Sequence, residues 1–289
     1  MLRQTLQDFE IIIVDDASHQ NVGECITALS DSRIKYSRLE TNQGEAVARN
    51  TAIAQAKGEY IAFLDDDDEW LPDKLAIQLK LMETAPSDIA GVYSGFFWVD
   101  WPSRQILGQR VFSSNGDFCR SLQKRNVVGT PSTVLLRRKC LQEIGGFDKN
   151  IAYGVDHDLW LRIAVKYRLK YIPRLLVRCH VHNDRLSNDL ELLVRGERDM
   201  LRKYPPINPE HRYYHARRCL SLGEKLCMEG DFHRGRTLLV DSIKFDHANW
   251  RAYVDLIALS MGQPGFLKVR KARKRIGGYL RKSLNGRLK

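Results

Sequence analysis

Three short apolar runs in the first 70 residues predict the strands of an α/β fold. Phe9–Val14, Ile34–Leu39 and Tyr60–Leu64 are rich in β-branched or aromatic residues and are bounded by polar ones. Between the second and third runs, Asn42–Glu45 has the form of a capping box, and the helix that follows it is expected to stop at Gly58. Strands and helices that alternate at this spacing predict a parallel α/β sheet.

The pattern changes in the second half of the chain. Asp156–Lys166 has apolar positions at helical spacing, and Pro205, Pro206 and Pro209 mark a boundary. Residues 210–262 read as helices without a strand pattern, and part of them resembles one hairpin of a tetratricopeptide array. We therefore predict an α/β domain over residues 1–204, a helical hairpin region over 205–266 and a basic tail over 267–289.

The positive charge of the chain is concentrated in that tail. Of the net charge of +11, the ten Lys and Arg residues after Asp255 supply nearly all, and 36 basic and 35 acidic residues precede them. The body is thus close to neutral, and no specific nucleic-acid partner is expected. The tail interleaves basic and apolar residues, which is typical of a peripheral membrane-binding segment. A solvated tail and non-specific nucleic-acid binding are the alternatives.

Cysteine usage and the longest apolar runs indicate where the protein acts. Its six cysteines form no CxxC pair, which is typical of reduced thiols in the cytoplasm and disfavours a structural zinc site. The longest uncharged apolar runs, Ile89–Val99 and Leu256–Leu267, are shorter than the roughly 20 residues of a membrane-spanning helix. We expect a cytoplasmic protein, with peripheral contact at the inner face of the plasma membrane through the basic tail.

Aspartates follow two of the predicted strands directly. Asp15 and Asp16 end the first, and Asp65–Asp68 end the third. Ligands of parallel α/β sheets bind at the carboxyl ends of the strands. Four consecutive carboxylates repel one another unless a cation lies among them, and Mg²⁺ or Mn²⁺ is the expected cofactor. The alternative is a solvated acidic turn that caps the next helix.

Several motifs, in order, resemble glycosyltransferase family 2, whose members have the GT-A fold. The resemblance covers roughly residues 1–190, and its segments are Gln7–Ser18, Asn42–Trp70, Leu71–Leu75, Ile144–Asp148 and Val155–Ala164. It implies a GT-A α/β domain, Rossmann-like with a mostly parallel sheet, followed by a small helical C-terminal region. It also implies transfer of a sugar, usually with inversion, from a nucleotide-diphosphate donor to a hydroxyl acceptor.

The resemblance assigns roles to the donor-site residues. Asp16, with Asp15 beside it, would read the nucleotide base, and Arg49 would lie near that base. The aspartates from Asp65 to Asp67 occupy the DxD position, with Asp66 near the ribose and Asp67 on the metal that bridges the diphosphate.

Two further residues would complete the site. His182 resembles the late histidine that completes the metal or diphosphate site in many relatives, and a surface histidine without a role is the alternative. Asp156 resembles the general base, with Asp158 as second choice. Val155 stands where the family usually has glutamate, a departure that removes one carboxylate near the base. For Asp156 itself, the other interpretation is a helix N-cap.

The first residues differ from the family pattern. Relatives usually begin about two dozen residues earlier with an apolar strand, and Met1–Thr5 looks like the end of the helix that follows it. We expect a misassigned start here, and a true truncation is the alternative. Three other functions stay open: a nucleotidyltransferase, a catalytically degenerate sugar-nucleotide-binding protein, and nucleic-acid binding through the tail. The expected acceptor is a glycan or a lipid-linked sugar, in cell-surface glycan synthesis.

Overall fold

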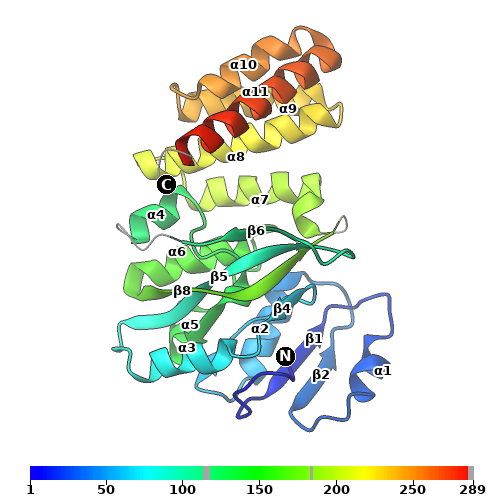
Figure 1. The fold of residues 1–289 in the computed structure, drawn as a ribbon, viewed down its shortest axis with the longest axis vertical. Helices are drawn as coiled ribbons and strands as arrows, with labels where there is room; N and C mark the ends of the chain where they lie inside the picture. Colours follow the sequence, from blue (N-terminus) through cyan, green and yellow to red (C-terminus); the bar gives the residue numbers. More distant parts are fainter. Residues whose placement is uncertain (113–117, 183–184, 286–289) are drawn as a thin grey trace. The chain divides into compact units, whose positions relative to one another are not determined.

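A computed structural model describes residues 1–112, 118–182 and 185–285 of the chain (Figure 1). These residues divide into two compact units, Met1–Asn188 and Asp189–Lys289. The first unit holds the strands, and the second is helical.

Unit 1 contains a two-stranded sheet and a six-stranded sheet. The smaller pairs β1 (Ile11–Asp15) with β2 (Ile34–Arg38) in parallel. The larger has the order β3-β7-β5-β8-β4, with β6 on β5. Its strands are β3 (Tyr60–Ile61), β4 (Asp68–Trp70), β5 (Ile89–Asp100), β6 (Ile106–Arg110), β7 (Val134–Arg137) and β8 (Arg168–Val181). The long pair β5–β8 forms its centre (Figure 1).

The strand pairing differs in part from the parallel sheet expected from the sequence. The pairs β1–β2 and β5–β8 are parallel, and the other described pairs are antiparallel. The apolar run Tyr60–Leu64 is a strand only over its first two residues, and these pair with β7 in the larger sheet. The local hydrophobic pattern predicts that a segment is a strand, but the direction in which that strand pairs depends on tertiary packing.

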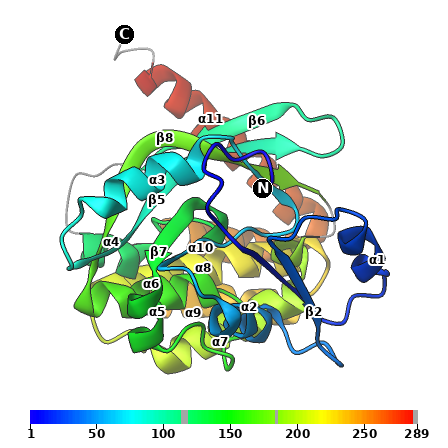
Figure 2. The same ribbon diagram turned by 90° about the horizontal axis from the view of Figure 1, so that it is seen from below.

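The helices of unit 1 are short. They are α1 (Val22–Thr27), α2 (Glu45–Gln55), α3 (Lys74–Glu83), α4 (Phe118–Lys124), α5 (Arg138–Ile144) and α6 (Val155–Lys166), with 3₁₀ turns η1 (Pro131–Thr133) and η2 (Leu186–Asn188). Helix α2 packs on β1 (Figure 2). Its start differs from the predicted capping box, because Gly44 precedes it at φ +89° and no side chain caps it. Glu45 is therefore the first helical residue, and its side chain pairs with Arg49 one turn later.

The core of unit 1 lies between the larger sheet and α3. Trp70, Leu75, Met82, Val92 and Phe96 are buried there. Burial of large aromatic and aliphatic side chains stabilises this packing by roughly 1.5–3 kcal/mol per residue. The core thereby anchors β4, the strand that follows the turn formed by the acidic run.

Unit 2 is helical, as expected. Its helices are α7 (Leu190–Lys203), α8 (Pro209–Met228), α9 (Phe232–Phe245), α10 (Trp250–Leu259) and α11 (Gly262–Asn285). Helices α8 and α9 approach closely where two glycines face each other: a Cβ on Gly235 would lie 2.3 Å from Sγ of Cys227, and one on Gly223 3.0 Å from the Gly235 carbonyl oxygen. The hairpin therefore needs glycine at position 235.

The observed division lies before α7, whereas the sequence interpretation put the boundary at residue 204. A buried polar contact explains the difference. Glu197 of α7 accepts a hydrogen bond from Nδ1 of His215 at 2.7 Å, and Nε of Arg218 donates to it at 3.1 Å, both from α8. Since Glu197 and His215 are buried, α7 is held to the helical unit.

The basic tail begins inside α11. Nε of Arg270 lies 3.3 Å from Glu224, and Arg273 pairs with Glu224 and with the fully buried Asp255. Phe266 is fully buried and Val269 packs against the same core. The start of the tail is thus part of the helical unit. The side chains from 274 onward, on which most of the membrane-binding prediction rests, lie outside the described residues.

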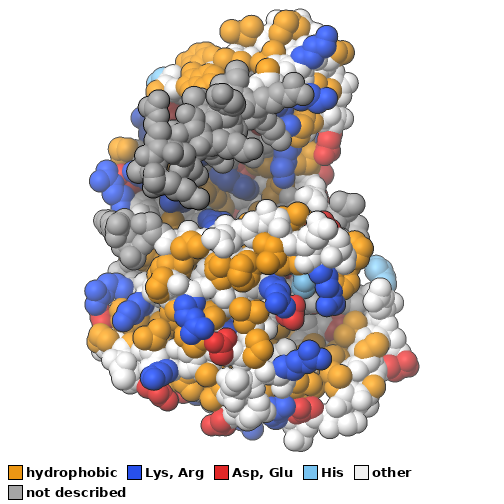
Figure 3. Space-filling model, viewed as in Figure 1, with side chains coloured by type: hydrophobic (Ala, Val, Ile, Leu, Met, Phe, Trp, Pro, Cys, Tyr) orange, Lys and Arg blue, Asp and Glu red, His pale blue; other side chains and the backbone are white. Residues whose placement is uncertain are grey.

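Among the described residues, no helix combines the length and the hydropathy that crossing a bilayer requires. On the face of the molecule in Figure 3, basic and acidic side chains are interspersed over the strand-containing unit. This mixture agrees with the near-neutral charge expected for the body of the chain.

Candidate active site

The acidic run lies where β4 meets β8. In the antiparallel pairing of these strands, Asp68 stands opposite Cys179 and Trp70 opposite Val177. The Asp68 amide donates to the carbonyl oxygen of Asp65 at 3.0 Å, which closes the run into a tight turn. Because Nε1 of the buried Trp70 donates to the Ser132 carbonyl oxygen at 2.8 Å, the end of this turn is fixed to the core.

Three carboxylates of this turn converge. One oxygen each from Asp65, Asp67 and Asp68 lies within 4.8 Å of the other two, whereas Asp66 is exposed and outside this group. Oδ1 of Asp68 is buried and has no hydrogen-bond partner in the described part of the chain. Burial, with the neighbouring carboxylates, raises the pKa of Asp68 to about 6. A hard divalent cation fits this oxygen donor set, because it would relieve the repulsion and satisfy the orphaned oxygen.

The end of β8 brings two histidines to Asp67. Nε2 of His182 lies 3.0 Å from Oδ2 of Asp67, and Nδ1 of His180 lies 2.7 Å from its carbonyl oxygen. Nε of Arg185 is 3.4 Å from the same Oδ2. The structure therefore joins the predicted pair Asp67 and His182, although 115 residues separate them in the sequence.

Helix α2 contributes a charged pair to the same site. Arg49 donates to Oδ1 of Asp65 at 2.7 Å and pairs with Glu45 at 2.8 Å, one helical turn earlier. Burial raises the pKa of Glu45. Arg49 also stacks over the Phe147 ring, 5.3 Å from its centroid. The arginine expected near the nucleotide base thus lies against the acidic turn.

The aspartates after β1 hold the loops around them. Asp15 accepts from the Ser18 amide at 2.8 Å, from the Tyr36 hydroxyl at 2.8 Å and from Arg38 at 3.2 Å. The Ser18 hydrogen bonds, together with Tyr36 and Arg38, lower the pKa of Asp15 to about 2. Among the described residues, the hydrogen-bond partners of Asp15 come from the loop after β1 and from β2, and not from the acidic turn.

Asp16 connects the end of β1 to the start of α2. Its carboxylate accepts from the backbone amides of Gln43 at 2.8 Å and Gly44 at 2.7 Å. Because α2 begins at the next residue and carries Arg49, Asp16 is linked to Asp65 through this helix.

Asp156 lies in the first turn of α6. The N-cap of this helix is Gly154, so Asp156 is not the cap that the other interpretation made it. Burial, and then the charge of Glu45, raise the pKa of Asp156 to about 6. Its Oδ2 accepts a hydrogen bond of 2.8 Å from Asn126. A carboxylate with a raised pKa beside an acidic turn is suited to take up a proton near neutral pH.

Val155 and Asp158, which are close to Asp156 in the sequence, have buried side chains. Val155 is 1% exposed, so the residue that replaces the family's glutamate is part of the core. Asp158, the second choice for the base, is fully buried and pairs with Arg162 at 2.8 Å. Arg162 in turn donates to the carbonyl oxygens of Ile144 and Gly146, so Asp158 supports the neighbouring loop.

Sequence reasoning missed several polar residues of this site. They are Glu45, Asn50, Asn126, Thr130 and Ser132. The sequence pattern predicts only a capping role for Glu45, and Asn50 lies inside the segment Asn42–Trp70 without a predicted role. The other three contact aspartates 30 to 67 positions away, a distance at which local sequence carries no signal.

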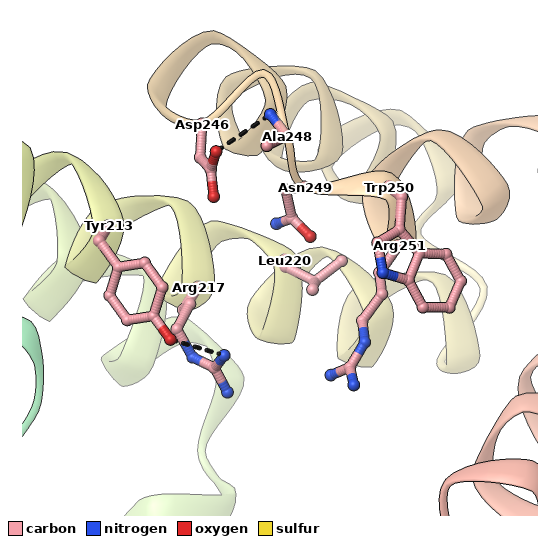
Figure 4. A pocket seen from close by; sticks show the side chains of 8 residues that line it. All are labelled: Tyr213, Arg217, Leu220, Asp246, Ala248, Asn249, Trp250 and Arg251. Atoms are coloured by element: carbon pink, nitrogen blue, oxygen red, sulfur yellow. Dashed lines mark hydrogen bonds between the residues drawn. The ribbon is translucent and has the colours of Figure 1, made fainter.

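A separate hollow lies in the helical unit. It has a volume of about 240 Å³ and is lined from α8 and from the turn between α9 and α10 (Figure 4). Arg217 and Arg251 line it, and Asp246 is its one acidic residue. The Asp246 carboxylate accepts from the Ala248 amide at 3.0 Å, and the lining holds no group of carboxylates like the one formed by Asp65, Asp67 and Asp68.

Comparison with known proteins defines the class. The chain resembles the crystal structure of TarS 1–349 from S. aureus in complex with UDP, with a TM-score of 0.59 at 17% identity over 94% of this chain and 85% of that one. It also resembles the mannosyltransferase PcManGT from Pyrobaculum calidifontis, in complex with GDP-Man and Mn²⁺, with a TM-score of 0.52 at 17% identity over 93% and 79%. The fold is that of a GT-A glycosyltransferase, which confirms the expected α/β class with its helical C-terminal region.

The sequence comparisons then give the family. The model of "Glycosyl transferase family 2" matches residues 1–145, and the chain belongs to that family. It is 32% identical over 171 residues to the putative colanic acid biosynthesis glycosyl transferase WcaA of Escherichia coli K12, which is 58% of this chain and 60% of that protein. It is 34% identical over 163 residues to WfgD of Escherichia coli, 56% of this chain and 61% of that protein. WfgD is described as a UDP-Glc:α-D-GlcNAc-diphosphoundecaprenol β-1,3-glucosyltransferase. The matches thus span about 60% of the length of these curated relatives.

Proposed function

We propose that the protein is a metal-dependent inverting glycosyltransferase that moves a sugar from a nucleotide-diphosphate donor to a hydroxyl acceptor. The observation that carries this proposal is the joining of two groups in one unit: the converging oxygens of Asp65, Asp67 and Asp68, and the raised pKa of Asp156. The two groups are linked by one short segment, because Asn126 donates to Asp156 at 2.8 Å and Thr130, four residues later, donates to Asp65 at 3.0 Å.

The donor half of the site follows from the acidic turn. Asp67, with its neighbours Asp65 and Asp68, would hold Mg²⁺ or Mn²⁺, and His182 would complete the site. When bound, the cation neutralises charge on the diphosphate leaving group. Asp66 is exposed at the turn and would contact the ribose. Asp15, Asp16 and Arg49 would bind the nucleotide, through side chains already fixed by hydrogen bonds.

The acceptor half rests on Asp156. Its carboxylate takes the proton of the acceptor hydroxyl while that oxygen forms a bond to the anomeric carbon. The bond from this carbon to the diphosphate oxygen breaks on the opposite face, and its electron pair leaves with the nucleoside diphosphate. Because the attack comes from the face opposite the leaving group, the configuration of the anomeric carbon inverts.

The relatives support a class of acceptor. WcaA is named for colanic acid biosynthesis, and WfgD for a diphosphoundecaprenol-linked acceptor. We infer a glycan or lipid-linked acceptor in cell-surface glycan synthesis. An acceptor of this kind lies at a membrane surface, which fits a cytoplasmic enzyme that contacts the inner face of the plasma membrane through its basic tail.

Release of nucleoside diphosphate tests the proposal. The chain is incubated with UDP-glucose, UDP-N-acetylglucosamine and GDP-mannose in turn, with Mn²⁺ or EDTA and a diphosphoundecaprenol-linked GlcNAc acceptor. We expect one of the three donors to be consumed when Mn²⁺ is present and none to be consumed in EDTA. The product should have the inverted configuration at the anomeric carbon. The Asp156→Asn variant should bind the same donor without transferring its sugar.

Two results would favour the other functions. Donor binding without transfer in the wild-type chain indicates a degenerate sugar-nucleotide-binding protein. Release of pyrophosphate from a nucleoside triphosphate, unaffected by Asp156→Asn, indicates a nucleotidyltransferase. Either result contradicts the proposal.

A further inference from the structure

We propose that the segment Asn126–Ser132 positions the base relative to the donor site, with Asn126 holding Asp156 and Thr130 holding Asp65. This inference rests on the proposed function and names positioning residues for it. The segment precedes β7 and includes the start of η1, and its polar side chains contact two parts of the site that come from different elements.

Asn126 fixes one oxygen of the base. Its Oδ1 accepts from the backbone amides of Val128 at 3.1 Å and Gly129 at 2.9 Å, so its Nδ2 must be the group that faces Asp156. Nδ2 donates to Oδ2 of Asp156 at 2.8 Å and to the Gly129 carbonyl oxygen at 3.1 Å. The carboxylate also accepts a hydrogen bond from the backbone amide of His157, so it is held by the first turn of α6 as well as by Asn126.

Gly129 makes this arrangement possible. Its φ is +90°, a conformation that residues with a side chain rarely adopt. A Cβ at this position would lie 3.0 Å from Cε1 of Phe96 and 3.3 Å from Phe112. The turn that places the Gly129 amide on Asn126 thus needs glycine.

The other end of the segment holds the acidic turn. The Thr130 hydroxyl donates to Oδ2 of Asp65 at 3.0 Å, and the Asp65 amide donates to the Ser132 hydroxyl at 3.1 Å. The Ser132 carbonyl oxygen accepts from Nε1 of Trp70. Ser132 is fully buried, so the segment is anchored on both sides of the acidic run.

The consequence is a fixed relation between two chemical groups. The Asp156 carboxylate and the Asp65 carboxylate each accept a hydrogen bond from residues only four positions apart. Positioning of this kind sets how far the acceptor oxygen lies from the anomeric carbon, and small displacements of catalytic groups are costly. The described charged groups that act on Asp156 are Glu45, Arg49, Asp65 and Arg110.

Paired variants separate the two ends of the segment. Asn126→Ala removes a hydrogen bond that stabilises the ionised carboxylate of Asp156, so it should raise the pKa of Asp156. We therefore expect kcat to fall about tenfold and the acidic limb of the pH profile to move to higher pH. The KM for the donor should stay the same. Thr130→Val should instead raise the KM for the donor and leave the acidic limb in place, and Thr130→Ser should restore the KM.

The controls keep the test independent of folding and of turnover. Asn150→Ala replaces an exposed asparagine whose side chain donates to the nearby Asp148 at 3.1 Å, and it should match the wild type. Circular dichroism confirms that each variant is folded. The pKa of Asp156 is also read by ¹³C NMR of aspartate-labelled protein, with Asp156→Asn for assignment. An unchanged pKa in Asn126→Ala overturns the inference even if the chain transfers no sugar, whereas a raised pKa without transfer supports it and contradicts the proposed function alone.

Discussion

Asn50 and Phe147 are joined by two reciprocal hydrogen bonds across 97 positions of the sequence. Nδ2 of Asn50 donates to the Phe147 carbonyl oxygen at 2.8 Å, and the Phe147 amide donates to Oδ1 of Asn50 at 2.8 Å. This contact ties α2 to the loop that precedes α6. Since Arg49 stacks on the Phe147 ring, the same contact orients the arginine toward Asp65.

The two hydrogen bonds between Asn50 and Phe147 should contribute to the free energy of unfolding. Asn50→Ala leaves two backbone groups of a buried residue unpaired, and we expect a loss of about 2 kcal/mol in the free energy of unfolding. Gly146→Ala should cost a similar amount, because its Cβ would lie 2.4 Å from Oδ1 of Asn50 and its φ is +68°. Urea denaturation measures both. If Gly145→Ala, whose Cβ would meet nothing within 4 Å although its φ is +85°, costs as much as Gly146→Ala, backbone strain and not the Asn50 contact limits this loop.

The two aspartates of α6 should respond differently to the same substitution. Asp156→Asn removes the proposed base and should lower kcat by roughly 10²–10⁴-fold with little change in stability. Asp158→Asn breaks a pair whose carboxylate is fully buried and should destabilise the fold by about 3 kcal/mol. Steady-state kinetics and thermal unfolding on both variants make the comparison. A fully active Asp156→Asn enzyme would contradict the assignment of the base.

The pH dependence of transfer should report Asp156. Because burial and Glu45 raise its pKa to about 6, the base is protonated below that pH and kcat/KM should fall as the pH drops through 6. Glu45→Gln removes a negative charge that favours the protonated form. It should therefore shift the acidic limb to lower pH. A profile without a limb near pH 6, or one that Glu45→Gln moves upward, would contradict this explanation.

The ionisation of Asp15 should make the free energy of unfolding depend on pH. Its pKa is lowered from 3.8 to about 2, so its ionised form contributes stability above about pH 4, and this contribution is lost as the pH falls through 2. Asp15→Asn should cost roughly 2 kcal/mol at pH 7, and the difference from the wild type should shrink between pH 4 and pH 2. Denaturation curves at several pH values measure it. A difference that stays constant down to pH 2 would mean that the charge of Asp15 is unimportant.

Much of the fold and the first part of the site could be predicted from local sequence. The apolar runs located β1 and β2, and the acidic run located the turn before β4. Placing His182 beside Asp67 required the family resemblance, because β8 brings them together from 115 positions apart. The mixed sheet depends on tertiary packing, and so do the contacts of Asn50 with Phe147 and of Asn126 with Asp156. Local sequence does not encode such packing.

Metal-dependent binding of a nucleoside diphosphate is tested most directly by thermal unfolding with UDP, GDP and dTDP, each with and without Mn²⁺. A ligand that binds only the folded state raises the melting temperature by mass action. The variant is Asp67→Asn, and the matched control is Asp88→Asn, an exposed aspartate that pairs with Arg168. We expect a shift with one diphosphate that requires Mn²⁺, is lost in Asp67→Asn and persists in Asp88→Asn. A shift that is independent of Mn²⁺ or survives Asp67→Asn would contradict the proposed metal site, and no shift with any diphosphate would contradict the donor site itself.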